Sequence, residues 1–174
     1  MVTKIGLKNA VLGGLLAVVG LLLATPAEAT TWVMVQQGHP LSYFKGTQTP
    51  VATWTDVGFA ENQDWTAAAT GFGIGYGDGD DATVLSDMLG GYLTVYVRSH
   101  FTMGSEASSV TSLELEAIFD DGFVAYLNGT EIARSNVPSG PLQASDAASG
   151  GHEASDGAQT FVVSPSLLVQ GDNV

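Results

Sequence analysis

The chain has 174 residues, and its 18 acidic side chains against 5 lysines and arginines give a formal net charge of −13 at pH 7. This acidity argues against nucleic acid or an anionic membrane surface as a partner, because both need a positive footprint. There is no cysteine, so the core must form without disulfides, and 45% of the residues are hydrophobic. Only 13% are charged and glycine is abundant, which favours an exported all-β protein over a helical one.

Residues 1–29 have the three parts of a secretory signal peptide. Lys4 and Lys8 form a positive start, residues 10–24 are apolar apart from glycines, and Ala27-Glu28-Ala29 fits the small-residue cleavage rule. We therefore predict an N-terminal signal helix that is removed on export. The protein is then expected to be secreted, and to lie outside the cell or in the cell envelope.

A membrane anchor is the alternative for this leader. Residues 9–27 carry no charge, and that length approaches the ~20 apolar residues of a spanning helix. Pro26 and the cleavage rule favour the signal peptide, with no stable membrane span after cleavage. The remaining residues, 30–174, are predicted to form one domain.

Short runs of β-branched and aromatic residues predict strands along this domain. In residues 111–119, Leu113, Leu115, Ala117 and Phe119 alternate with polar residues and are predicted to face the core. Other strands are predicted at 30–35, 92–101 and 161–163, and a short edge segment at 43–46.

Between these strands the sequence predicts loops. Trp54, Phe59 and Trp65 fit neither a helix nor a strand, and we expect an ordered loop that buried aromatic side chains hold in place. Residues 72–83 are rich in glycine and are predicted to be irregular, whereas 84–91 could form a helical turn.

Residues 120–134 carry the strongest local signal of the chain. Asn128-Gly129 lies between two strand-like runs, and a type I′ turn requires φ > 0 at both central positions. We predict an antiparallel hairpin here. Residues 136–159 follow as a loop that is long for a compact domain, so it is either functional or mobile.

Near the end, Ser164-Pro165 resembles the start of a helix, and residues 171–173 read as a turn. One apolar residue then follows, as if a strand were beginning, and we expect the last strand to be missing. Short strands, many turns and no long amphipathic helix together predict an antiparallel β-sandwich.

Several strings of the chain, taken together, resemble a galactose-binding-like jelly-roll module of large secreted bacterial proteins. The resemblance spans most of residues 32–174 and rests on residues 43–47, 54–56, 64–65, 75–80, 120–131, 165–169 and Asn173. It implies a non-catalytic accessory module. The family usually ends with one more strand after the Asn-Val pair, in agreement with the missing strand expected above.

The loop Asp78-Gly79-Asp80-Asp81 is a candidate metal site. Its carboxylates could wrap a Ca²⁺ ion with oxygen ligands, and Asp78, Asp80 and Asp81 are the candidate ligands. It is not an EF-hand, because Thr83 and Leu89 stand where that loop needs glycine and glutamate. The alternative is a turn whose carboxylates cap backbone N–H groups.

The other motifs do not match a catalytic or metal-binding pattern. Asp120-Asp121 is better explained as a turn than as a glycosidase pair, and His152-Glu153 lacks the second histidine of a zincin motif. The tryptophans could stack on sugar rings, but two of the three are expected in the core.

We therefore predict a non-catalytic module that binds a polysaccharide or glycan, or that packs against neighbouring domains of the same polypeptide. A structural spacer or adhesion domain is one alternative. The other is the N-terminal part of a secreted phosphoesterase or glycosidase whose active site lies beyond Val174.

Overall fold

The structure is a computed structural model that describes residues 4–11, 30–69, 71 and 73–174. Short strands and single 3₁₀ turns make up its regular elements, and the described residues contain no α-helix. The strands are β1 (Lys4–Val11), β2 (Thr31–Val35), β3 (Ser42–Lys45), β4 (Thr66–Ala67), β5 (Ile74–Gly75), β6 (Thr83–Val84), β7 (Val95–Arg98), β8 (Phe101–Met103), β9 (Leu113–Ile118), β10 (Phe123–Leu127), β11 (Thr130–Ser135), β12 (Gln159–Val163) and β13 (Gly171–Asn173). The 3₁₀ turns are η1 (Ala52–Thr55), η2 (Ser105–Ser109), η3 (Ala154–Asp156) and η4 (Pro165–Leu167).

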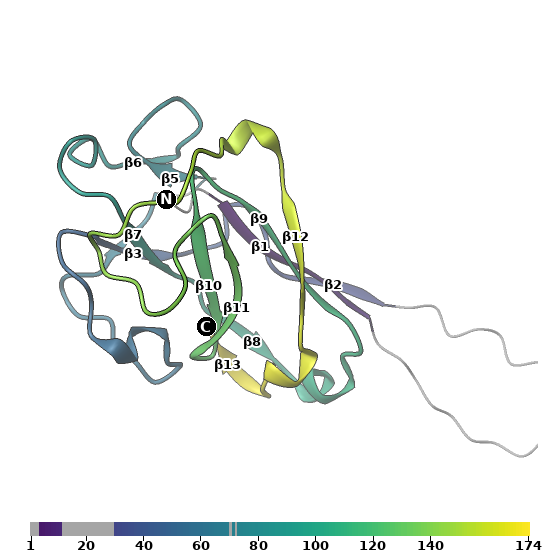
Figure 1. The fold of residues 1–174 in the computed structure, drawn as a ribbon. Coiled ribbons are helices and arrows are strands. Elements are labelled where there is room, and N and C mark those ends of the chain that lie inside the picture. Colours follow the sequence, from purple (N-terminus) through teal and green to yellow (C-terminus); the bar gives the residue numbers. More distant parts are fainter. Residues whose placement is uncertain (1–3, 12–29, 70, 72) are drawn as a thin grey trace, which may run out of the picture.

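The predicted all-β class is confirmed, and the sheets are antiparallel apart from the short parallel pair β5–β6. The largest sheet has the order β12-β9-β1-β2, and a second sheet has the order β4-β3-β7. Two further pairs, β10–β11 and β13–β8, complete the antiparallel part (Figure 1). Among the described residues, no helix reaches the length and apolar character that crossing a membrane requires.

The start of the chain differs from the predicted signal helix. Lys4–Val11 form β1, which pairs with β9 on one side and β2 on the other. A strand at this place satisfies backbone groups of β9 and β2 that would otherwise lack a neighbour. The helix is therefore not observed in this segment, while residues 12–24 of the apolar region and the cleavage site lie outside the described residues. Export remains a prediction.

The main core lies where the strands of the largest sheet meet β8, β10 and β11. The predicted alternation of β9 is confirmed, because Leu113, Leu115 and Ala117 are at most 1% exposed. Phe119 and Phe123 pack with ring centroids 4.7 Å apart. Full burial of side chains of this size contributes roughly 1.5–3 kcal/mol each, so these strands are the main source of stability.

The predicted hairpin is confirmed in β10 and β11. Asn128 has φ 52° and Gly129 has φ 84°, as a type I′ turn requires, and the ladder closes on Leu127 and Thr130. The Asn128 side chain also donates to the Leu167 carbonyl at 2.9 Å and to Asn173 Oδ1 at 2.8 Å. The turn therefore anchors the end of the chain as well as the hairpin.

Other local predictions need correction. Residues 92–101 form two shorter strands, β7 and β8, and β3 lies between β4 and β7 rather than at an edge. Residues 171–173, predicted as a turn, form β13, because their backbone pairs with β8 from Gly171↔Met103 to Asn173↔Phe101. The described part of the predicted irregular segment, residues 73–83, is mostly irregular, and β5 and β6 are only two-residue strands.

Candidate functional site

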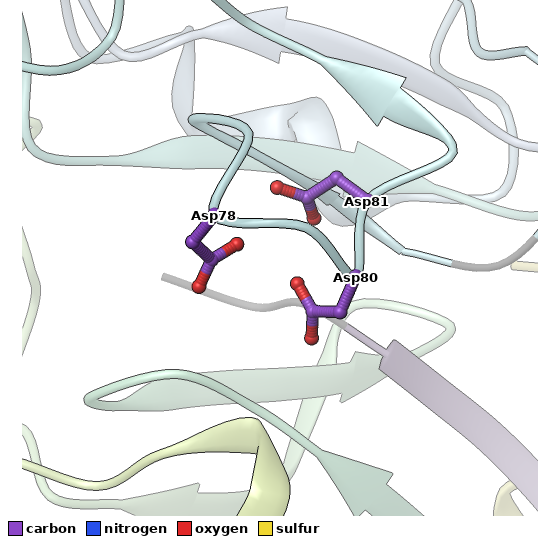
Figure 2. Close-up of side chains that lie close together, drawn as sticks. All are labelled: Asp78, Asp80 and Asp81. Carbon is purple, nitrogen blue, oxygen red and sulfur yellow. The ribbon is translucent and has the colours of Figure 1, made fainter.

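The loop between β5 and β6 brings together the three carboxylates that the sequence singled out. Asp78, Asp80 and Asp81 each offer an oxygen that lies within 4.8 Å of an oxygen of the other two, and Figure 2 shows the three side chains turned toward one another. Gly77 and Gly79 allow the tight path of the loop with φ of 93° and 116°. These oxygens are hard ligands, the donor type that Ca²⁺ prefers.

The negative field of this loop extends to the start of the hairpin. Tyr76 donates its hydroxyl to Asp120 Oδ2 at 3.5 Å, and the charges of Asp120 and Asp78, together with partial burial, raise the pKa of the tyrosine. Burial, followed by the charge of Asp121, raises the pKa of Asp120. Asp120 is 5% exposed, so an ionised carboxylate here is costly. Carboxylates concentrated in this way attract cations.

The loop also shows the competing structural role. The Gly77 N–H donates to Asp81 Oδ2 at 3.0 Å, so one of the three carboxylates caps backbone in the way that a Gly-Asp turn does. Asp81 therefore has a structural role in this loop besides its place in the carboxylate cluster.

A second feature is an apolar cleft between β7 and β10. It contains two cavities of about 150 Å³ each, and both are lined by Trp54, Val97, Val124 and Tyr126. The first cavity extends toward the main core, and the second toward the loop at residues 137–148. Further apolar residues line the first cavity: Val35, Leu41, Ile74, Phe101, Leu115 and Ile132.

Trp54 covers this cleft from the loop that precedes β4. Its ring centroid lies 5.3 Å from that of Tyr96 on β7 and 5.7 Å from that of Tyr126 on β10, with edge-to-face geometry in both cases. It also stacks on Trp65 at 6.1 Å. The predicted aromatic loop is thus observed, and its rings contact each other rather than forming an open platform for a sugar. Trp65 is 9% exposed.

A buried arginine holds that loop in place. Arg98 is 2% exposed, although it alternates along residues 92–101 with the apolar Val95 and Val97, a pattern that predicts it on the opposite side of the strand. Its guanidinium donates to Glu61 Oε1 at 2.9 Å and to the carbonyls of Trp54 and Asp56. It also lies over the ring of Phe59, 5.1 Å from the centroid. Each of the three guanidinium nitrogens therefore has a hydrogen-bond acceptor, as a buried cation requires.

The long loop 136–159 is pinned by side chains that bond to backbone. Arg134 donates to the carbonyls of Pro138 and Gly140, and Asn136 donates to those of Asp121 and Gly150. Asn136 adopts φ 55° to do so. The loop forms one wall of the second cavity.

The remaining candidates are separated by the fold. The His152 ring stacks on Phe119 at 4.1 Å, His39 bonds to Ser99, and His100 bonds to Glu61, so the three histidines occupy different places. Asp120 is buried while its neighbour Asp121 is exposed, with φ 57°. The two carboxylates do not share one surface.

Sequence reasoning missed the cleft. Its signal was present in apolar residues at the outward positions of β10, namely Val124 and Tyr126, which alternate with the buried Phe123, Ala125 and Leu127. A strand that is apolar on both faces indicates a second buried side. Comparison of the chain with known protein families, with characterised proteins and with solved structures found no match.

Proposed function

We propose that this protein is a non-catalytic accessory module that packs against a partner polypeptide through the cleft between β7 and β10. The single observation that carries the proposal is the cleft itself, whose first cavity has a mainly apolar lining although the chain is strongly acidic. Apolar clefts rimmed by polar surface mark binding sites.

Carbohydrate binding is less well supported. A sugar needs exposed aromatic faces and several polar groups around them, whereas Trp65 is buried and Trp54 packs between Tyr96 and Tyr126. Trp32 is partly buried and packs against the main core. The aromatic side chains therefore serve the fold and cover the cleft.

The finer fold assignment belongs to the same proposal. We infer a galactose-binding-like jelly-roll sandwich, supported by the antiparallel sheets and by the resemblance of the sequence strings. We further propose that residues 1–29 act as a signal peptide, whose removal takes β1 from between β9 and β2, and that the module works outside the cell or in the cell envelope. A neighbouring domain of the same polypeptide is then the expected partner.

The acidic loop is proposed to hold a structural Ca²⁺ ion. Asp78, Asp80 and Asp81 would supply carboxylate oxygens, and the donor set fits because all three are hard oxygen ligands that already converge. Bound calcium would fix the β5–β6 loop. The cation would have no catalytic role.

An apolar fluorescent dye and a matched pair of variants test the cleft. Val124 lines both cavities, whereas Val162 on β12 is 85% exposed and does not line either. We expect the dye to bind the 174-residue chain, Val124→Lys to reduce its affinity at least tenfold, and Val162→Lys to leave the affinity unchanged. Equal binding by both variants would contradict the proposal.

Affinity electrophoresis in gels that contain each of a panel of polysaccharides tests the carbohydrate alternative. The three proteins are the unmodified chain, Val124→Lys and Val162→Lys. We expect no retardation. Retardation of the unmodified chain and of both variants would place a glycan site outside the cleft and favour the carbohydrate function over packing.

A further inference from the structure

The two strands that border the cleft have backbone edges without a strand neighbour. In the part of the chain that the structure describes, β7 pairs only with β3 and β10 pairs only with β11. An edge strand points alternate N–H and C=O groups away from its partner, and such a row is a template for another strand. Here two such edges face one cleft.

The two edges run in the same direction. The second cavity is lined by residues 93–97 and by Gly122, Phe123, Val124 and Tyr126, and the first by residues 97–99 and 124–126, so the lining passes from the second cavity to the first along both segments. At the other end, Asn128, just beyond β10, bonds to Val174, and β13, which precedes Val174, pairs with β8, the strand that follows β7. A single strand could therefore lie antiparallel to both β7 and β10.

The β13–β8 ladder already points into this space. β13 runs antiparallel to β8, and the same register carried further leads past Val174 toward Ser99 and Val97. Val174 lines the first cavity, its carbonyl accepts from the Asn128 N–H, and its N–H donates to Asn128 Oδ1, each at 2.9 Å. Asn173, which is fully buried, fixes this geometry by bonding to Val169 and Gly171.

The size and chemistry of the cleft fit a strand better than a small molecule. Ligand pockets usually measure roughly 300–1,000 Å³, whereas each cavity here is about 150 Å³ and two of them follow one another along the strands. Successive cavities suit successive side chains of an extended peptide. Arg98 is the one arginine, lysine, aspartate or glutamate side chain in the lining of the first cavity, and it pairs with Glu61 at 2.9 Å.

We propose that the cleft accepts an extended peptide strand, apolar at alternate positions, which a neighbouring domain supplies and which pairs antiparallel with both β7 and β10. Strand addition of this kind draws affinity from main-chain hydrogen bonds and specificity from pockets for alternate side chains. The inference rests on the packing function proposed above and names its partner. The acidic chain favours a strand with basic ends.

The first experiment uses the 174-residue chain and a seven-residue peptide in which valine alternates with threonine, with one lysine at each end. We expect binding by calorimetry, and slower hydrogen exchange in Val95–Arg98 and Phe123–Leu127 when the peptide is present. N-methylation at alternate residues removes backbone donors without changing the side chains, and should weaken binding at least tenfold.

The Val124→Lys variant should bind the peptide at least tenfold more weakly, and the Val162→Lys control should bind normally. Because Val124→Lys could disturb folding, the N-methylated peptide supplies an independent test on the unmodified chain. A second arm fuses the same seven residues directly after Val174, which raises their local concentration. The fusion should melt at least about 5 °C higher than a fusion with proline at two alternate positions.

Three results would overturn the proposal. One is equal affinity for the methylated and unmethylated peptides, since the main-chain pairing would then be absent. Another is no binding in trans together with equal melting temperatures of the two fusions. The third is self-association of the free chain that protects β7 and β10, which would make a second copy the occupant. If the dye still binds the cleft in any of these cases, the packing function stands without the strand.

Discussion

Replacement of Arg98 by methionine tests how the aromatic loop is held over the cleft. The change keeps an unbranched side chain of comparable length but removes the donors to Glu61 and to the carbonyls of Trp54 and Asp56. Loss of one partner of a buried ion pair costs about 3–5 kcal/mol. The Glu61 side chain is 26% exposed and keeps its contact with His100, so water can partly compensate.

We therefore expect Arg98→Met to lower the free energy of unfolding by about 3 kcal/mol, toward the lower end of that range. For a domain of this size the melting temperature should fall by about 6–12 °C, measured by scanning calorimetry. Arg98→Lys should recover less than half of the loss, because an ammonium cannot reproduce the planar fork of the guanidinium.

Lys45→Met is the matched control. Lys45 pairs with Asp87 at 2.7 Å, but its side chain is 40% exposed, and such surface pairs contribute about 0–1 kcal/mol. Equal losses for Arg98→Met and Lys45→Met would refute the reasoning. So would full stability of Arg98→Lys, since charge alone would then suffice to hold the loop.

Three more predictions concern the turn, the buried carboxyl and the acidic loop. Gly129→Val should destabilise the chain by about 2 kcal/mol, because a β-branched residue resists the φ of 84° found there; an unchanged melting temperature would contradict the turn assignment. Asp120→Asn should stabilise the chain at pH 7, because burial raises the pKa of Asp120 and its ionisation therefore lowers the free energy of unfolding. This gain should disappear as the pH falls below the usual pKa range of aspartate, where the carboxyl is neutral in both the folded and the unfolded chain. Urea denaturation at pH 7 and at that lower pH measures the gain, and an equal gain at the two pH values would contradict the prediction. Calcium at about 100 times its Kd should stabilise the chain by about 2.7 kcal/mol, measured by thermal unfolding with calcium and with a chelator. The rise in melting temperature should be lost in Asp80→Asn and kept in Asp64→Asn. An unchanged melting temperature of the unmodified chain would contradict the proposed calcium site.

Local chemistry made part of the fold predictable from the sequence. The Asn128-Gly129 turn is predictable because few residue pairs tolerate φ > 0 at both positions. The strand at residues 113–118 is predicted by the strict alternation of apolar and polar residues. The three aspartates of the candidate metal loop were found because they are neighbours in the chain, so a tight loop brings them together.

Contacts between residues distant in sequence could not be predicted from the sequence. The strand alternation predicts Arg98 on the side opposite the apolar residues. The sequence does not reveal its burial, because its partners, Glu61 and the Trp54 carbonyl, are distant in sequence and only the fold brings them to it. β13 was predicted as a turn since Gly171-Asp172 has turn chemistry, yet pairing with β8 overrides that local preference. The cleft likewise depends on how two distant strands are placed.

The most direct test of the account is residue-resolved hydrogen exchange of the free, monomeric chain in β7 and β10. We predict an alternating pattern: amides that bond to β3 or β11 are protected, and those that face the cleft exchange faster. Uniform protection along both Val95–Arg98 and Phe123–Leu127 would show that their edges are already paired, and would contradict an open cleft between them.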